Sequence, residues 1–159
     1  MPIPINRQSH RILALDLGGQ LGYAWLPADG HPVYGTWDLT QGAGGRRSYV
    51  PAYNLKRLLE TEVPKNGFNH IAFEETFAQG EAKLRLDSLQ TIVAVYCIEH
   101  GLDWSRVAAS SLKKFATGDG RCGKEQMVNA ARDFFSIRHK PMTYDEADAL
   151  CVLAWALGY

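Results

Sequence analysis

The order of the apolar segments constrains the fold of this 159-residue chain more than any other feature. Three short apolar runs near the start, each typical of a strand, cover residues 12–17, 23–26 and 33–39. Gly18, Gly19 and Gly22 predict a turn between the first two runs, and Asp29-Gly30 indicates a hairpin turn before the third. Helical and strand-like patterns then alternate to the end. This order predicts an α/β fold in which helices flank a five-stranded mixed sheet, three antiparallel strands followed by parallel ones.

The remaining elements follow from the spacing of apolar residues. Strands are expected at residues 71–74 and 104–108, and helices at residues 48–63, 79–100, 110–116, 124–135 and 143–157. The composition, 46% hydrophobic and 21% charged, is that of a globular chain and excludes disordered classes. At this length we expect one domain, residues 11–159, preceded by a flexible arm at residues 1–10.

The cysteines and the apolar runs bear on location. Cys97, Cys122 and Cys151 are widely spaced and match neither a zinc-ligand pattern nor a disulfide framework. The first ten residues have no apolar core of a signal peptide, and no run approaches the length of a membrane span. We therefore expect a cytoplasmic protein without a membrane partner.

Two acidic residues stand at the ends of buried strands. Asp16 closes the first apolar run, and Glu74 closes the run at residues 71–74. A charge at such a place is costly unless it is exposed, paired or bound to a cation, and sites in α/β sheets gather at the carboxyl ends of strands. Glu75 competes with Glu74, since strand alternation puts the two on opposite faces.

The last helix contributes further carboxylates. Thr143 and Glu146 form a capping box, so the charges of Asp145 and Glu146 are also explained by the helix N-terminus alone. Asp148 is not explained in this way, because it lies at the edge of an apolar stripe and shares a face with Asp145. Four carboxylates would then form an all-oxygen site suited to Mg²⁺ or Mn²⁺, as in two-metal phosphodiester hydrolysis. The residues thus predict a metal-dependent nuclease.

At these residues the chain resembles the RuvC family of Holliday junction resolvases, within the RNase H-like superfamily. Residues 12–18 with Gly22-Tyr23-Ala24 are similar to the family's first strand and hairpin, and residues 72–77 to its fourth-strand motif. Residues 113–126 are similar to its Lys…Gly-x-Gly…Lys-x-Gln segment, and residues 145–150 match its closing D-x-A-D-A-L motif. The four blocks occur in the family's order and extend over nearly the whole of residues 11–159.

The resemblance implies an RNase H-like fold and an enzyme, a crossover junction endodeoxyribonuclease. It selects Glu74 over Glu75 and implies that two Mg²⁺ ions, replaceable by Mn²⁺, are held by four catalytic acids, Asp16, Glu74, Asp145 and Asp148. Lys113 and Lys124 would contact phosphates of the cut strand, and Phe77 would pack against bases at the branch point. The family acts as a homodimer that makes paired nicks in four-way junctions, and compact phage-type members cut many branched DNAs.

Further basic residues give a second indication of a DNA partner. The formal net charge is zero, which taken alone argues against nucleic acid, but residues 105–140 hold eight basic and only three acidic side chains. Lys114 and Arg121 belong to this segment, and Arg46-Arg47 follows a glycine-rich loop from which it could reach phosphates. We therefore expect weak non-specific binding to duplex DNA and reliance on junction shape and metal.

The helix at residues 79–100 carries two apolar stripes. One comprises Ala82, Leu86, Leu89, Val93 and Tyr96, and the other, less apolar, comprises Leu84, Ser88, Thr91, Val95 and Ile98. A helix that is apolar on two sides is buried on two sides, either within one chain or against a second copy. The resemblance favours the second copy.

Three other functions compete with junction resolution. An RNase H-like nuclease could act on RNA or an RNA–DNA hybrid, and a DNA-binding module could use the same fold without catalysis. Asp16-Leu17-Gly18-Gly19 also begins sugar kinases and actin-like ATPases, although those need a second domain.

Overall fold

The computed structural model describes residues 11–42, 49–75 and 77–159, so the arm expected at residues 1–10 lies outside the described residues. Five strands form one sheet in the order β3-β2-β1-β4-β5. The first three pair antiparallel and the last two join in parallel, which confirms the predicted mixed sheet. The strands are β1 (Ile12–Asp16), β2 (Gln20–Trp25), β3 (Val33–Asp38), β4 (His70–Glu75) and β5 (Asp103–Ala108).

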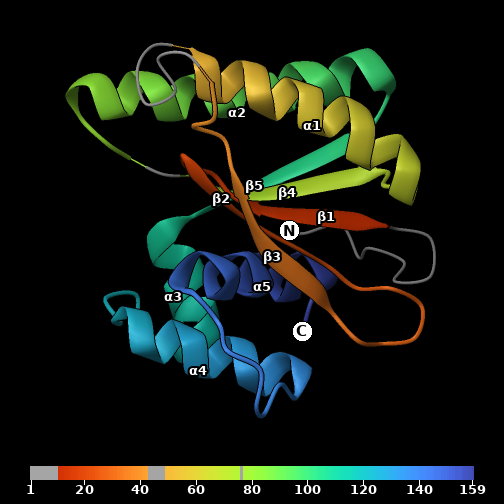
Figure 1. Ribbon diagram of the computed structural model, residues 1–159. Helices are drawn as coiled ribbons and strands as arrows, with labels where there is room; N and C mark the ends of the chain where they lie inside the picture. Colours follow the sequence, from red (N-terminus) through yellow and green to blue (C-terminus); the bar gives the residue numbers. More distant parts are fainter. Residues whose placement is uncertain (1–10, 43–48, 76) are drawn as a thin grey trace.

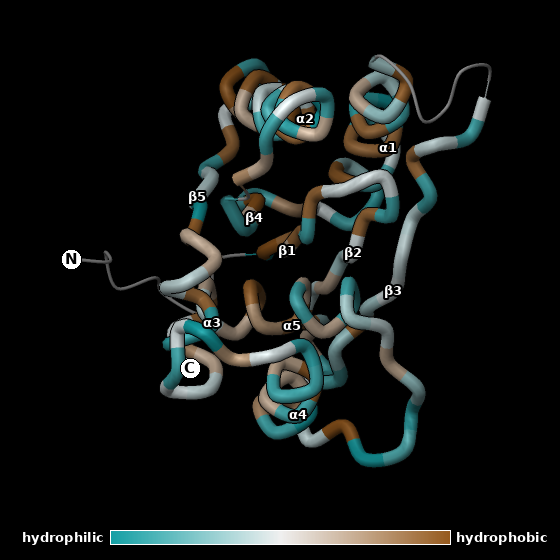
Figure 2. Tube along the Cα trace, turned by 90° about the vertical axis from the view of Figure 1, so that its left-hand side faces the viewer, coloured by the Kyte–Doolittle hydropathy of each residue, from teal (hydrophilic) through white to brown (hydrophobic). Residues whose placement is uncertain are grey.

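Helices cover both faces of the sheet. One face is covered by α1 and α2, and the other by α5, with α3 and α4 on its outer side (Figures 1 and 2). The five helices are α1 (Val50–Asn66), α2 (Gly80–His100), α3 (Ala109–Thr117), α4 (Lys124–Phe135) and α5 (Tyr144–Leu157). Among the residues that the structure describes, none of these helices has the length and apolar character needed to cross a bilayer.

Strand β1 lies at the centre of the sheet, and both of its faces are buried. This position explains why its sequence is continuously apolar. Leu13 and Leu15 belong to the cluster beneath α1 and α2, whereas Ile12 and Ala14 belong to the cluster beneath α5. Since side chains alternate along a strand, the next residue on the α5 side is Asp16. The alternation of buried residues along β1 therefore places Asp16 on the face of the sheet that α5 covers.

Small residues allow α5 to lie close to the sheet. Ala14, Ala24 and Ala72 are fully buried in the cluster that contains α5. Gly22 makes the closest approach, because an added Cβ would lie 2.1 Å from the backbone oxygen of Asp145. The expectation that Gly22 forms part of a turn was wrong: it lies inside β2, paired with Asp16, where only a hydrogen fits beneath the start of α5.

Some helix boundaries differ from those expected. Helix α1 continues to Asn66 rather than ending at residue 63, because Gly67 adopts the left-handed conformation and its N–H donates to the oxygen of Val63. Helix α5 begins at Tyr144, after Thr143, whose side chain caps it as predicted. These shifts move ends by a few residues and leave the element order intact.

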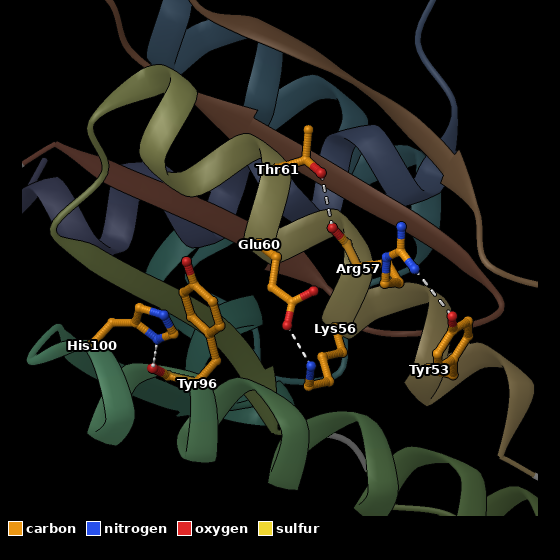
Figure 3. A network of polar contacts seen from close by, with 7 residues as sticks. All are labelled: Tyr53, Lys56, Arg57, Glu60, Thr61, Tyr96 and His100. Carbon is orange, nitrogen blue, oxygen red and sulfur yellow. Dashed lines mark hydrogen bonds and ion pairs between the residues drawn. The ribbon is translucent and has the colours of Figure 1, made fainter.

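The outer layer of α1 and α2 carries contacts at one-turn spacing within single helices. Lys56 pairs with Glu60, and Arg57 donates to the hydroxyl of Tyr53 at 3.2 Å, both along α1 (Figure 3). At the end of α2, Tyr96 stacks on His100 with ring centroids 4.1 Å apart. These contacts stabilise the separate helices.

Candidate metal and nucleic-acid site

Three carboxylates from three different elements converge between the sheet and α5. Asp16 ends β1, Glu74 lies near the end of β4, and Asp148 lies in the second turn of α5. One oxygen of each lies within 4.8 Å of the others. Because β1 and β4 are parallel neighbours, their carboxyl ends meet at one edge of the sheet, and α5 brings the third acid to that edge.

Strand alternation separates Glu74 from its neighbour Glu75. Glu74 follows Ala72 on the face covered by α5, whereas Glu75 follows Phe73 on the face covered by α1 and α2. Glu75 pairs with Arg106 of β5 at 3.5 Å. Of the two acids, only Glu74 belongs to the carboxylate cluster.

Asp145 occupies the first turn of α5 and joins the cluster through Asp16. The two carboxyl groups are hydrogen-bonded, and the charge of Asp145 also acts on Asp148 one turn later. Among the described residues, the group whose oxygens all lie within 4.8 Å of one another contains Asp16, Glu74 and Asp148. Asp145 therefore lies beside the three-acid group as a fourth carboxylate on its Asp16 side.

Burial and mutual repulsion make the ionised form of these acids costly. Burial raises the pKa of Asp16 well above its usual value, and the three neighbouring carboxylates raise it further. Burial, followed by the charge of Asp148, raises the pKa of Glu74 to about 7. Burial, followed by the charge of Asp145, raises the pKa of Asp148 to about 6. A nearby cation would relieve this repulsion.

Two lysines already act on the cluster. Lys113 of α3 lowers the pKa of Glu74 and Asp148, and Lys124, the first residue of α4, also lowers that of Asp148. Burial and repulsion outweigh both effects, since the pKa values remain raised. The two lysines therefore do not fully offset the repulsion among the carboxylates, and a further positive charge would stabilise their ionised form.

The other expected DNA contacts differ in how the structure places them. Phe77 is 84% exposed just beyond β4, an unusual position for a large apolar ring. Lys114 and Arg121 are exposed in α3 and in the turn before α4. Arg46 and Arg47 lie outside the described residues.

The donor set fits a hard divalent cation. All the converging groups are carboxylates, partly buried and mutually repulsive, which is the environment that Mg²⁺ or Mn²⁺ stabilises. Among the described residues, the three-acid group contains carboxylates and no soft ligand, which argues against zinc.

Two residues of the site escaped sequence reasoning. Gly22 lets the first turn of α5 approach beside Asp16. The signal in the sequence for this role was a glycine within a strand-like pattern. Tyr144 immediately precedes Asp145, and its hydroxyl donates to Glu125 of α4 at 2.6 Å. An aromatic residue directly before the acidic pair is the signal that would have drawn attention to it.

Comparison with protein families finds a match over most of the chain. The family model described as crossover junction endodeoxyribonuclease RuvC matches residues 52–156. A relative of that name from Dehalococcoides mccartyi strain 195 is 28% identical over 147 residues, which cover 89% of this chain and 88% of the relative. One from Mycobacterium sp. strain KMS is 26% identical over 109 residues, 67% of this chain and 57% of the relative.

Solved structures show the same fold. The Thermus thermophilus RuvC structure in complex with a Holliday junction substrate superposes with a TM-score of 0.72 at 16% identity, covering 94% of this chain and 97% of that one. The yeast mitochondrial Holliday junction resolvase gives a TM-score of 0.64 at 14% identity, covering 94% and 79%. These likenesses identify the arrangement of sheet and helices as RNase H-like.

Proposed function

The chain belongs to the RuvC family of crossover junction endodeoxyribonucleases, and we propose that it resolves four-way DNA junctions by metal-dependent paired nicks. As a member of this family it is a nuclease of branched DNA, and its nuclease domain is residues 11–159 in our proposal. The observation that carries the proposal is the convergence of Asp16, Glu74 and Asp148 between β1, β4 and α5.

The carboxylates would hold the metal. Asp16, Glu74 and Asp148 supply oxygens close enough together to share one ion, and Asp145, beside Asp16, supplies a ligand for a second. Two Mg²⁺ or Mn²⁺ ions held by these acids would supply the activation of a water and the stabilisation of the leaving oxygen. The raised pKa values give the metal a second role, because binding offsets repulsion between carboxylates.

The lysines would receive the substrate. Lys113 of α3 and Lys124 of α4 both act electrostatically on the acid cluster, so a phosphate bound at the acids would also meet these two cations. Lys114 and Arg121 continue this charge along the exposed surface. Phe77 offers an exposed ring just beyond the end of β4, the strand that carries Glu74, where it would stack against unstacked bases at a branch point.

A second copy of the chain would cover the exposed face of α2. Leu84, Val95 and Ile98 lie exposed on α2, and Ile98 has 67% of its surface accessible. An isologous contact through this stripe would place two acid clusters in one particle, as paired nicks require. We expect Ile98→Glu to shift the protein from dimer to monomer in analytical ultracentrifugation, whereas Thr61→Glu, an exposed control on α1, leaves it dimeric. A wild-type protein that sediments as a monomer with and without junction would contradict the dimer.

The cytoplasm is the compartment that we propose. The three cysteines are free and buried, as suits a reducing environment.

A nicking assay on labelled DNA tests the function. Wild-type protein with Mg²⁺ is expected to cut a four-way junction symmetrically and to leave an RNA–DNA hybrid and structured RNA nearly intact. Asp16→Asn should bind the junction but lose cleavage by about a thousandfold or more. The matched control Asp29→Asn, at an exposed turn where Asp29 accepts from the N–H of His31, should cut like wild type. Equal cutting by Asp16→Asn, or preference for the hybrid, would refute the assignment.

A further inference from the structure

Tyr144 lies in an unusual place for an aromatic residue. It is the first residue of α5, directly before Asp145, and 43% of its surface is accessible. With Glu125 and Arg132 it borders an open cavity of about 430 Å³ between α4 and the start of α5. A ring in this position contributes little to the core, so packing alone does not account for it.

The ring contacts a lysine that faces the acids. The Lys124 ammonium lies 5.2 Å from the centroid of the Tyr144 ring, within the range of a cation–π contact. Tyr144 directly precedes Asp145, so this contact brings the Lys124 ammonium to the end of α5 that carries Asp145 and Asp148. Lys124 is therefore held against an aromatic face at the acidic end of α5.

The start of α4 makes this restraint necessary. Lys124 is the first residue of the helix, where the dipole disfavours a positive charge, and its side chain is exposed and long. Glu125 stands next to it and would attract the ammonium away from the acids. The hydroxyl of Tyr144 donates to the Glu125 carboxylate and occupies one of its oxygens. The Tyr144 side chain thus contacts Lys124 with its ring and binds Glu125, the competing carboxylate, with its hydroxyl.

We propose that Tyr144 is a positioning residue, which holds the Lys124 ammonium beside the acid cluster so that it meets the phosphate of the cut strand. This inference rests on the proposed nuclease function. Tyr144 itself need not touch the reacting atoms. It acts through Lys124, and its removal should slow the chemical step without weakening the junction complex.

Single-turnover kinetics at saturating junction test the proposal. We expect Tyr144→Leu to lower the nicking rate about tenfold, the equivalent of a lost cation–π contact in a desolvated complex, while the junction Kd changes by less than about twofold. Tyr144→Phe keeps the ring but frees Glu125, so it should rescue most of the rate. Tyr53→Leu, an exposed tyrosine on α1, is the matched control and should cut at the wild-type rate.

A double mutant separates positioning from a structural role. In a Lys124→Ala background, Tyr144→Leu should cost less than about twofold, because the group that it positions is gone. A tenfold loss in that background would overturn the proposal, as would an unchanged rate in Tyr144→Leu alone. Thermal melts of every variant, expected to agree with wild type within a few degrees, exclude misfolding.

NMR of ¹³C-lysine-labelled protein gives a readout that does not depend on cleavage. The Lys124 ε-methylene protons, identified by their absence in Lys124→Ala, should show an upfield ring-current shift in wild type and in Tyr144→Phe and lose it in Tyr144→Leu. If the shift is the same in all three, Tyr144 does not hold the lysine. If wild-type protein shows the shift but nicks no branched DNA, the proposed function fails while the contact stands.

Discussion

Glu74→Gln should stabilise the metal-free fold while it removes a proposed metal ligand. The pKa of Glu74 is about 7 in the folded chain, against an ordinary value of 4.5, because the carboxylate is buried and faces Asp148. The folded state therefore binds this proton more tightly than the unfolded state does. The resulting stability is fully present below about pH 4.5 and is lost as the pH rises through about 7.

The size of the effect follows from the two pKa values. Each tenfold difference in proton affinity is worth about 1.4 kcal/mol, so a rise from 4.5 to about 7 costs the ionised wild type about 3 kcal/mol at pH 8. The amide of glutamine stays neutral and avoids this cost. For a domain of this length, about 3 kcal/mol corresponds to a rise of about 6–12 °C in Tm. At pH 5 the advantage should shrink to about 1 kcal/mol.

The assay is thermal unfolding in EDTA at pH 8 and pH 5, repeated with Mg²⁺. Glu75→Gln is the matched control, since Glu75 lies on the other face of β4 in a pair with Arg106 that is worth under about 1 kcal/mol. Mg²⁺ should raise the Tm of wild type more than that of Glu74→Gln, which lacks one of the ligands. A variant that is no more stable than wild type at pH 8, or equally stabilised at both pH values, would refute the electrostatic reasoning.

Three further predictions concern packing, the thiols and salt. Gly22→Ala should lower the free energy of unfolding by about 2–3 kcal/mol in denaturant titrations and also slow nicking, since its Cβ would displace the start of α5. The three buried cysteines should react with a thiol reagent only as the chain unfolds, because burial raises the pKa of Cys97 to about 11 and that of Cys151 to about 12. Affinity for linear duplex should fall with salt with a log–log slope shallower than about −5, and a steeper slope would contradict the inference from zero net charge.

The layered fold could be predicted because its signals are local. The apolar run of β1 and the capping box at Thr143 each depend on neighbours a few residues away. To predict that Glu74 rather than Glu75 faces α5, one must also know on which side of β4 this helix packs. Strand alternation shows that the two acids face opposite layers, and the packing of the sheet shows which layer each one faces.

The rest depended on contacts between distant segments. Tyr144 and Glu125 are nineteen residues apart, and nothing in either helix pattern indicates that the two N-termini meet. Gly22 lies more than a hundred residues before Asp145, whose backbone oxygen it admits, and a glycine among strand residues is more often associated with a turn or bulge. Such approaches follow from helix placement, which periodicity does not specify.

The same close approach explains why the site is both costly and usable. If Gly22 carried a side chain, α5 would stand further from the sheet, Asp148 would lie further from Asp16 and Glu74, and water would enter between them. The pKa values would then fall toward ordinary ones, which would recover only part of the stability that displacing α5 costs. The chain would also lose the close set of carboxylate oxygens that would hold a cation. The glycine therefore links the mutual repulsion of the carboxylates to their affinity for a cation, and a variant that relaxes the repulsion should weaken the affinity.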